Sequence, residues 1–328
     1  MYEAALAFKA VEPWRWMYDS DMFGVQNPVD GEIGYCSALG NLGEVFALVV
    51  YPGTEGLESC NEFAAGELDG DGDEAIAILN CLMVAFEDRG ELEKRDLEVI
   101  RDLGHKFRGR KEWPIFRSYR PGYAPWYLTG DEVRFMTLAL QQATEVCLRC
   151  EENKGILMAP QEDQLLVRLA DKDGEGYAWR DEWLAPEYPD EGEDSLEPLI
   201  DELRVERARR AVTRKEGIWE TDFFPTPIYI QEGERPYYPR MFLWVDRSAG
   251  LILEFYLAPP SEGLTGFAES LLSAIEKSGS MPREIQVKRG EALALLSPLA
   301  SLLGIRLSLR ERLSLLEQAQ QSLLERFV

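Results

Sequence analysis

The stretch Trp113–Cys150, WPIFRSYRPGYAPWYLTGDEVRFMTLALQQATEVCLRC, predicts a strand, a stiff turn and a long helix in immediate succession. The helix is expected to begin at Thr129, because Glu132 follows three residues later, which is the spacing of a capping box. Apolar residues then recur every three or four positions to about Arg149, as in a helix with one buried face. We therefore expect this central helix to pack in a core with the strand Ile115–Tyr119.

The turn before the central helix contains the candidate ligand site of this region. Arg117 and Arg120 supply positive charge, Tyr123 and Trp126 supply aromatic surface, and two prolines stiffen the turn. The free amide groups at a helix start bind anions, so one hypothesis is a pocket for a small anionic ligand. The other hypothesis is that the aromatic residues fill a core and that both arginines form ion pairs with nearby acids.

The negative charge of the chain is concentrated in its first two thirds. The net charge of the 328 residues is −24, and residues 215–328 hold 12 Lys or Arg against 15 Asp or Glu, which is −3 of that total. Residues 1–214 therefore carry −21. Because phosphate repels such a surface, direct nucleic-acid binding is not expected of this part, and basic partners are favoured.

Length and composition predict two domains and the place where they separate. The run Ala185–Glu197, APEYPDEGEDSLE, has the proline and acid content of an exposed linker, and a charged, solvated helix is expected over Ser195–Lys215. We therefore predict an α+β domain over residues 1–185, an acidic linker and charged helix over 186–215, and an α/β domain over 216–328.

The first domain is expected to mix helices with short strands. Its predicted elements are an amphipathic helix before Pro13, a loop at Phe23–Pro28, strands Glu32–Leu39 and Glu44–Tyr51, a helix over about 56–67, helices Glu74–Phe86 and Asp96–Leu103, and, after the central helix, strands Ile156–Met158, Gln164–Ala170 and Gly176–Leu184. A D-G turn joins the last two strands into a hairpin.

The second domain has the predicted order βββαβαβα. Its elements are strands over Trp219–Ile230, Arg240–Asp246 and Leu251–Leu257, helix Leu264–Lys277, strand Glu284–Lys288, helix Glu291–Leu303, strand Ile305–Leu309 and a final helix Glu311–Phe327. A strand–helix–strand unit implies parallel pairing with a right-handed crossover. The fold class is therefore α/β, with a mixed sheet in which three antiparallel strands lead into parallel ones and helices cover the faces.

The candidate motifs for metal or redox chemistry are incomplete. The acidic run Asp69–Glu74 lacks the glycine and glutamate that a calcium loop needs at its sixth and twelfth positions, where Glu74 and Asn80 stand. Cys147 and Cys150 form a single C-x-x-C inside the central helix, which favours half-buried, reduced structural thiols.

Motifs for nucleotide binding and hydrolysis are missing. The sequence contains no glycine-rich phosphate loop, no dinucleotide fingerprint and no G-x-S-x-G. Its one histidine, His105, lies in a basic stretch and is expected to be a neutral surface residue. We therefore predict no cofactor and no catalytic residue.

The first half of the chain resembles an uncharacterised prokaryotic domain that is joined to a second domain of unknown function. The segments that carry the resemblance are Pro13–Trp14, Phe23–Gln26, Gly31–Tyr35, Gly43–Glu44, Tyr51–Gly56 and Pro121–Trp126. Together the two domains of this pairing would cover most of the chain. The resemblance implies no activity.

The second domain resembles a ribonuclease H-like core of the transposase or integrase type. Trp219–Asp222 is similar to the strand that carries the first metal-binding aspartate, and Val245–Ser248, with Asp246, is similar to the second strand and its turn. Met281–Ile285 is similar to the approach to the second aspartate, but Lys288 stands at that position. Two divalent cations need clustered carboxylates, so a lysine there repels the metal.

A metal site of this type would also need a third acidic residue, and Glu311 and Glu317 are the candidates for it. If this domain has kept a nuclease site, the resemblance implies that Asp222 and Asp246 bind its metal ions. We predict that no catalytic metal site exists at these two residues.

The leading functional prediction is a non-catalytic binding or interaction protein, since catalytic motifs are missing and Lys288 replaces an expected ligand. One alternative is a metal-dependent nuclease or phosphoesterase that uses Asp222 and Asp246. Another is an acidic protein that imitates nucleic acid and binds a basic protein. The chain has no signal peptide and no apolar run of about 18 residues, so a cytoplasmic protein is expected that does not contact the membrane.

Overall fold

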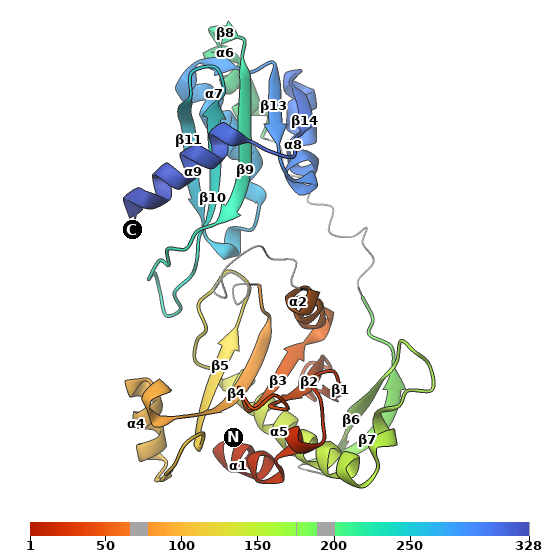
Figure 1. The fold of residues 1–328 in the computed structure, drawn as a ribbon. Coiled ribbons are helices and arrows are strands. Elements are labelled where there is room, and N and C mark those ends of the chain that lie inside the picture. The colour runs from red at the N-terminus through yellow and green to blue at the C-terminus, as the bar shows by residue number, and fades with distance from the viewer. Residues whose placement is uncertain (66–77, 175, 189–200, 328) are drawn as a thin grey trace. The chain divides into compact units, whose positions relative to one another are not determined.

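The computed structural model describes residues 1–65, 78–174, 176–188 and 201–327 (Figure 1). The chain divides into two compact units. Unit 1 comprises Met1–Pro121 and Pro125–Pro189, and unit 2 comprises Gly122–Ala124 and Asp190–Val328.

Unit 1 contains a seven-stranded sheet in the order β5-β4-β3-β2-β1-β6-β7. The strands are β1 Phe23–Gln26, β2 Ile33–Leu39, β3 Ala47–Pro52, β4 Cys81–Glu87, β5 Trp113–Tyr119, β6 Leu165–Asp173 and β7 Gly176–Leu184. Neighbouring strands pair antiparallel, except that β6 runs parallel to β1. The predicted α+β class is confirmed for this part of the chain.

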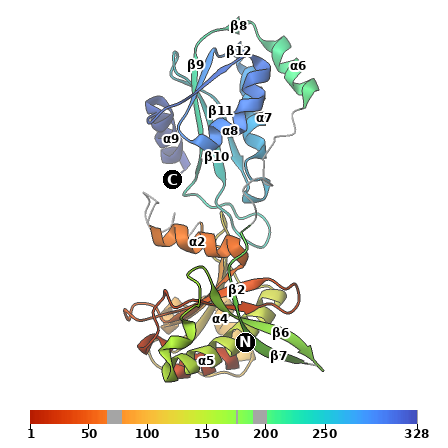
Figure 2. The ribbon, with the colours of Figure 1, turned by 90° about the vertical axis from the view of Figure 1, so that its right-hand side faces the viewer.

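Helices cover both faces of this sheet (Figures 1 and 2). They are α1 Tyr2–Val11, α2 Gly53–Ala65, α4 Lys94–Asp102 and α5 Gly130–Glu152, and the single-turn 3-10 helices are η1 Pro13–Arg15, η2 Arg89–Glu91 and η3 Lys154–Leu157. Because side chains alternate along a strand, Cys36 and Ala38 face the core with α1 and α5, whereas Tyr35 faces a smaller cluster beneath α2. The long helix α5 therefore has the central position that its periodicity predicts.

Unit 2 contains a five-stranded sheet in the order β11-β10-β9-β13-β14. Its strands are β9 Ile218–Pro225, β10 Arg240–Asp246, β11 Leu251–Ala258, β13 Glu284–Val287 and β14 Arg306–Leu309, and a small separate pair joins β8 Arg214–Lys215 to β12 Ser280–Met281. β9, β10 and β11 pair antiparallel, whereas β13 runs parallel to both β9 and β14. The predicted mixed sheet is confirmed.

The helices of unit 2 lie on opposite faces of its sheet (Figures 1 and 2). They are α6 Glu202–Ala211, α7 Thr265–Ser278, α8 Gly290–Leu303 and α9 Ser314–Phe327, with the 3-10 turn η4 Pro260–Glu262. α6, α7 and α8 share one core with Trp219, Phe223 and Trp244. α9 covers the other face through Leu316 and Leu323.

Three predictions for the first domain were wrong. Where a helix was predicted over Glu74–Phe86, the chain forms strand β4 from Cys81, which pairs with β3 on one side and β5 on the other. The periodicity of a short, continuous apolar run does not distinguish a buried strand from a buried helix. The predicted loop Phe23–Pro28 contains β1, which pairs with β2 and β6. The predicted strand Ile156–Met158 falls on the 3-10 helix η3, which closes the end of α5.

The charged helix expected over Ser195–Lys215 is shorter and less solvated than predicted. Its described part is α6, which begins at Glu202, where the Asp201 carboxylate accepts hydrogen bonds from the Leu203 and Arg204 amides. Val205 and Ala208 are buried in the core of unit 2. The candidate calcium loop Asp69–Glu74 and residues 189–200 of the acidic linker lie outside the described residues.

His105 and the two cysteines of the C-x-x-C all pack within unit 1. His105, expected at the surface, is half-buried and stacks on the rings of Tyr2 and Phe107, with centroids at 5.3 and 5.9 Å. Cys147 and Cys150 are buried free thiols, and burial raises the pKa of Cys150 to about 11. No helix among the described residues is long and apolar enough to cross a membrane.

Candidate functional sites

Arg117 closes a buried ion pair in unit 1. Its guanidinium donates two hydrogen bonds to the Asp96 carboxylate, at 2.9 and 2.7 Å, and lies 4.7 Å from the centre of the Tyr127 ring. Both partners are almost fully buried. Bidentate, charge-assisted pairs of this kind are the stronger class of hydrogen bond. Arg117 is therefore committed to holding strand β5 against α4.

Arg120 pairs with the cap of α5. Its Nη2 donates to Glu132 Oε1 at 2.9 Å, while Glu132 Oε2 accepts the Thr129 amide at 2.6 Å. Thr129 Oγ1 in turn accepts the Glu132 amide, so the predicted capping box is confirmed. Burial raises the pKa of Glu132, but the Thr129 amide and the Arg120 and Ser118 side chains outweigh this effect and lower it overall.

The two aromatic residues of the predicted ligand site make different contacts. The Trp126 backbone bridges Ser118 through two hydrogen bonds of 2.7 and 3.0 Å, which close the turn against β5. Tyr123 is counted with unit 2, where its ring lies 6.2 Å from that of Tyr237. Within unit 1, Arg117 and Arg120 each form an ion pair and Trp126 is bonded to β5.

Unit 1 nevertheless has a pocket of about 280 Å³ at the start of α5. Arg120 is one of its lining residues, together with five carboxylates and a set of polar and aromatic side chains. The lining consists of Asn27, Asp30, Glu32, Pro52, Glu55, Asn80, Leu82, Ser118, Tyr119, Arg120, Asp131, Glu132 and Phe135. The pocket lies where the helix start predicted one, but its charge is negative, and an anion would be repelled.

Three of the five pocket carboxylates have no cationic partner among the described residues. Glu132 pairs with Arg120 and Asp131 pairs with Arg134, which leaves Asp30, Glu32 and Glu55. Burial first, and then repulsion from its neighbours Asp30 and Glu55, raises the pKa of Glu32. Such a group of carboxylates favours a positively charged ligand.

Backbone geometry gives the pocket its shape at Gly53. This residue has a φ of 58°, and a Cβ there would lie 2.8 Å from Glu32 Oε1. Only glycine adopts such a conformation readily and leaves this space. Two of the segments that carry the sequence resemblance, Gly31–Tyr35 and Tyr51–Gly56, contribute lining residues, which is the one sequence signal that could have located the pocket.

In unit 2, Asp222 is a buried carboxylate bound by backbone amides. It lies on the α9 face of β9, since Trp219 and Phe223 face the other core and side chains alternate. Its Oδ1 accepts the Phe223 amide at 2.8 Å and its Oδ2 accepts the Lys288 amide at 3.0 Å. Burial raises its pKa, although these amides and nearby Arg289 act in the opposite direction. The carboxylate thus ties β9 to the end of β13.

The side chain of Lys288 reaches towards α9 from the end of β13. Its Nζ lies 3.8 Å from Glu317 Oε1, and both side chains are about half exposed. Of the two acids expected as candidates for a third position, Glu317 is therefore the one that the fold brings to Lys288. Glu311 precedes α9, which begins at Ser314.

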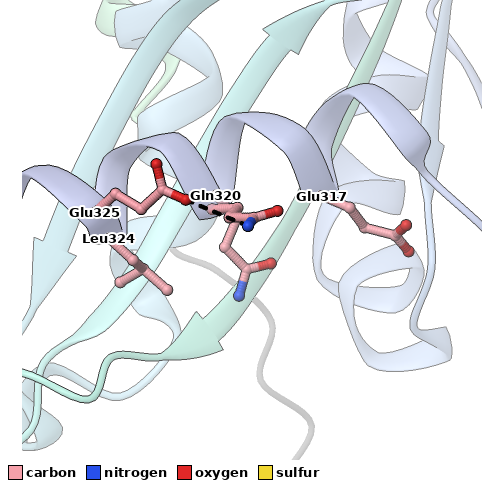
Figure 3. Close-up of a pocket in the computed structure, with 5 residues that line it drawn as sticks. Glu317, Gln320, Leu324 and Glu325 are labelled. Atoms are coloured by element: carbon pink, nitrogen blue, oxygen red, sulfur yellow. Dashed lines mark hydrogen bonds between the residues drawn. The ribbon is translucent and has the colours of Figure 1, made fainter.

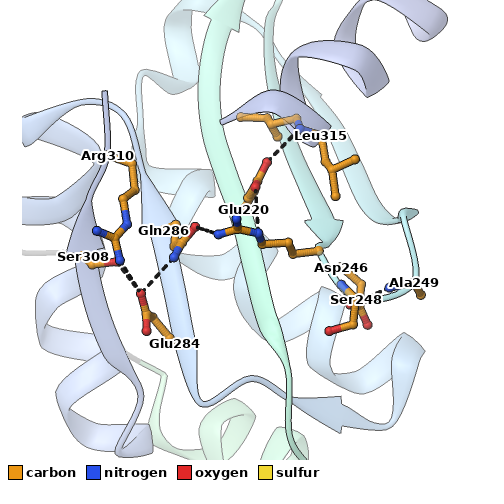
Figure 4. Close-up of polar contacts among 11 residues, drawn as sticks. Glu220, Asp246, Ser248, Ala249, Glu284, Gln286, Ser308, Arg310 and Leu315 are labelled. Carbon is orange, nitrogen blue, oxygen red and sulfur yellow. Dashed lines mark hydrogen bonds and ion pairs between the residues drawn. The ribbon is translucent and has the colours of Figure 1, made fainter. Parts of the chain in front are cut away.

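Asp246 does not join Asp222. In the register of β9 and β10, Asp246 lies opposite Trp219 and Asp222 lies opposite Leu243. Three residues along a strand separate the two positions by about 10 Å and place them on opposite faces. The Asp246 carboxylate instead accepts the amides of the turn residues Ser248 and Ala249, at 2.7 and 3.2 Å (Figure 4).

A polar network on the α9 face fixes the start of α9 (Figure 4). Buried Glu220 accepts the amides of Leu315 and Leu316 at 3.1 and 3.0 Å. A carboxylate at a helix start satisfies free amides and complements the helix dipole. Through this contact Glu220 positions the first turns of α9, and with them Glu317.

The same network continues across the parallel strands. Arg247, beside Glu220, donates to Gln286, whose amide donates to Glu284 at 3.0 Å. Glu284 Oε1 also accepts from Ser308 at 2.7 Å and Arg310 at 3.2 Å (Figure 4). An ion pair and hydrogen bonds therefore link β9, β13 and β14 on this face.

A groove of about 630 Å³ runs along α9 from Glu317 (Figure 3). Its described lining residues, Glu317, Gln320, Gln321, Leu324 and Glu325, all belong to this helix. Two carboxylates, two carboxamides and one leucine line it, and most of the surface that it exposes is apolar. Glu317 belongs both to this groove and to the ion pair with Lys288.

The residues of unit 2 do not fit the divalent metals of ribonuclease H-like cores. No group of three His, Cys, Asp or Glu side chains within the described ranges is arranged to hold a metal ion. Asp222 accepts backbone amides with both oxygens, and the ammonium group of Lys288 lies beside Glu317. A divalent cation would have to displace these donors and approach a positive charge.

Two known protein families match parts of the chain. Residues 1–168 match a family described as a domain of unknown function (DUF7309), and residues 204–324 match a second one (DUF6930). The predicted resemblance to two joined domains of unknown function is confirmed. No curated protein matches the chain.

Several solved retroviral proteins are similar to part of the chain. The HTLV-2 integrase catalytic core domain in complex with magnesium is 19% identical, over 35% of this chain and 74% of that one, with a TM-score of 0.28. The catalytic core domain of BIV integrase is 17% identical, over 33% and 67%, with a TM-score of 0.27. The simian T-cell lymphotropic virus intasome in complex with PP2A regulatory subunit B56 gamma is 22% identical, over 34% and 40%, with a TM-score of 0.28.

Proposed function

This chain belongs to the DUF7309 family, and we propose that it is a non-catalytic binding or interaction protein whose second unit has no nuclease chemistry. One observation supports the proposal, namely that Lys288 contacts both Asp222 and Glu317. Its amide donates to Asp222 Oδ2 at 3.0 Å, and its Nζ lies 3.8 Å from Glu317 Oε1.

The charge of Lys288 supports this proposal on electrostatic grounds. A two-metal phosphoryl-transfer site needs several carboxylates to bind and orient its cations. Here the Lys288 ammonium group supplies the positive charge beside Glu317 that a metal ion would supply in such a site. The pairing of Asp222 with two amides leaves neither of its oxygens without a donor. Both features favour a site that is stable without a divalent cation.

A charge-reversing substitution at Lys288 tests the proposal. We expect the wild type to show no Mn²⁺ or Mg²⁺ binding of millimolar affinity or tighter by titration calorimetry. Lys288→Asp should gain Mn²⁺ binding, because it replaces the cation with a third carboxylate near Asp222 and Glu317. Lys288→Gln is the matched control, since it removes the charge without adding a ligand, and it should gain little.

A cleavage assay separates this proposal from the nuclease alternative. Wild type and Asp222→Asn are incubated with single- and double-stranded DNA and RNA in the presence of Mg²⁺ or Mn²⁺. We expect equal, background-level cleavage from both proteins. Metal-dependent cleavage by the wild type that disappears in Asp222→Asn would overturn the proposal and establish a nuclease.

A further inference from the structure

We propose that unit 1 docks a basic, lysine- or arginine-rich segment of a partner protein on an acidic surface. This acidic surface consists of the pocket at the start of α5 and the outward side of α2, with Glu58, Glu62 and Phe63. One lysine or arginine side chain of the partner enters the pocket. The inference concerns unit 1 alone, and it stands or falls independently of the metal chemistry of unit 2.

The size of the pocket suits a side chain. At about 280 Å³ it lies just below the ~300–1,000 Å³ of pockets that hold free small molecules. Buried Phe135 and half-buried Tyr119 line it together with the carboxylates. Aromatic rings attract a cation through their faces, so carboxylates and rings together recognise an ammonium or guanidinium group on an apolar stem.

The charge of the pocket is complementary to such a group. Asp30, Glu32 and Glu55 have no cationic partner within the described parts of the chain, and the raised pKa of Glu32 reflects its burial and their mutual repulsion. The Asp30 carboxylate does accept the Asn27 side chain and the Glu32 amide, at 2.9 and 3.0 Å. These bonds orient the carboxylate and leave its charge uncompensated.

Helix α2 extends the acidic surface beyond the pocket. Glu55 lines the pocket. Glu58 lies three residues after Glu55, and Glu62 lies four residues after Glu58, on the same side of the helix. All three are exposed, and no ion pair engages them among residues 1–65, 78–174, 176–188 and 201–327. Like charges at this spacing destabilise a helix by a few tenths of a kcal/mol per pair, which a basic partner would reverse.

Phe63 indicates a polypeptide partner more than a small polycation. Its side chain is 47% exposed on α2, one residue after Glu62. A partner that covers this ring must supply an apolar side chain beside its basic ones. Nucleic acid is disfavoured because its phosphates are repelled by the same carboxylates, and a metal ion is disfavoured because no three-ligand group occurs in the described residues.

The test is a binding experiment with the full chain and defined probes. Fluorescence anisotropy measures the affinity for a labelled ten-residue peptide of lysines with one central leucine, compared with a glutamate peptide of the same length, spermine and Mg²⁺. We expect the lysine peptide to bind, the glutamate peptide not to bind, and spermine to bind at least tenfold more weakly. Binding should weaken as salt screens the charges.

Two charge-matched variants decide whether the acidic surface is responsible. Glu58→Lys/Glu62→Lys should weaken the peptide at least tenfold, whereas Glu151→Lys/Glu152→Lys should change the affinity less than twofold. Both change the net charge equally, but the second pair lies at the far end of α5, about 30 Å from its start at 1.5 Å per residue. Circular dichroism checks that both variants fold.

A third variant tests the pocket itself. Glu55→Gln removes one pocket charge with almost no change of shape and should also weaken the peptide. Failure of the lysine peptide to bind would overturn the proposal, as would an equal loss of affinity in the two charge-matched variants. Spermine binding as tightly as the peptide would show that a small polycation, and not a polypeptide, is the ligand class.

Discussion

Replacing Arg117 by alanine should destabilise unit 1 far more than the same change at Arg120, three residues away. The side chains of Arg117 and Asp96 are only 11% and 7% exposed, and Arg117→Ala leaves the carboxylate buried without its bidentate partner. Breaking a buried pair in this way costs about 3–5 kcal/mol. The Arg120 side chain is 51% exposed, and pairs of that kind contribute roughly 0–1 kcal/mol.

Differential scanning calorimetry of the full chain measures the difference. One kcal/mol corresponds to about 2–4 °C in the Tm of a domain of 150–250 residues. Arg117→Ala should therefore lower the Tm of unit 1 by about 6–20 °C, and Arg120→Ala by at most about 4 °C. The transitions of the two units are fitted separately, because one unfolding free energy is not defined for a chain with two domains.

A second substitution tests the cause of the loss. Adding Asp96→Asn to Arg117→Ala removes the uncompensated charge and should recover part of the lost stability, since an unpaired buried charge is the main penalty. The reasoning is refuted if Arg117→Ala loses as little stability as Arg120→Ala. It is also refuted if the added Asp96→Asn lowers the Tm further.

Two more predictions concern buried acids. Glu220→Ala should destabilise unit 2 by about 1–3 kcal/mol, because the Leu315 and Leu316 amides lose their acceptor. Hydrogen exchange of these two amides should become faster in Glu220→Ala, and less so in Glu220→Gln. Unchanged exchange in the alanine variant would contradict this prediction. The pKa of Glu132 is lowered in the folded state, so its ionised form stabilises the fold above about pH 4.5 and this contribution is lost as the pH falls through the lowered pKa. In a pH series, the unfolding free energy of the wild type minus that of Glu132→Gln should become smaller below pH 4.5. If this difference became larger there, the pKa of Glu132 would be raised by folding, contrary to the prediction.

Residue patterns within single elements were enough to predict much of the fold. The capping box at Thr129 and Glu132 and the apolar repeat after them determine where α5 begins and which face it buries. In unit 2 each strand and helix has its own pattern and turn, so the order βββαβαβα follows from local sequence. β4 escaped prediction because six successive apolar residues from Cys81 to Phe86 suit a buried strand or a buried helix equally.

The sites depended on contacts between elements that no local pattern specifies. The sequence placed a pocket at the start of α5 and positive charge at Arg120, but the pocket is negative because Asp30, Glu32 and Glu55 reach it from other segments. Likewise, sequence resemblance located Asp222 and Lys288, whereas strand register separated Asp246 from them and α9 selected Glu317.

Local sequence thus determined most elements of this protein and the start of its central helix. Tertiary structure decided which charges meet: Arg117 with Asp96, Lys288 with Glu317, and three carboxylates around one pocket that have no cationic partner within the described ranges. The physical reason is range. Propensity and periodicity act over a few neighbouring residues, whereas the charge of a site is the sum over side chains that are distant in sequence and are brought together only by sheet register and helix packing.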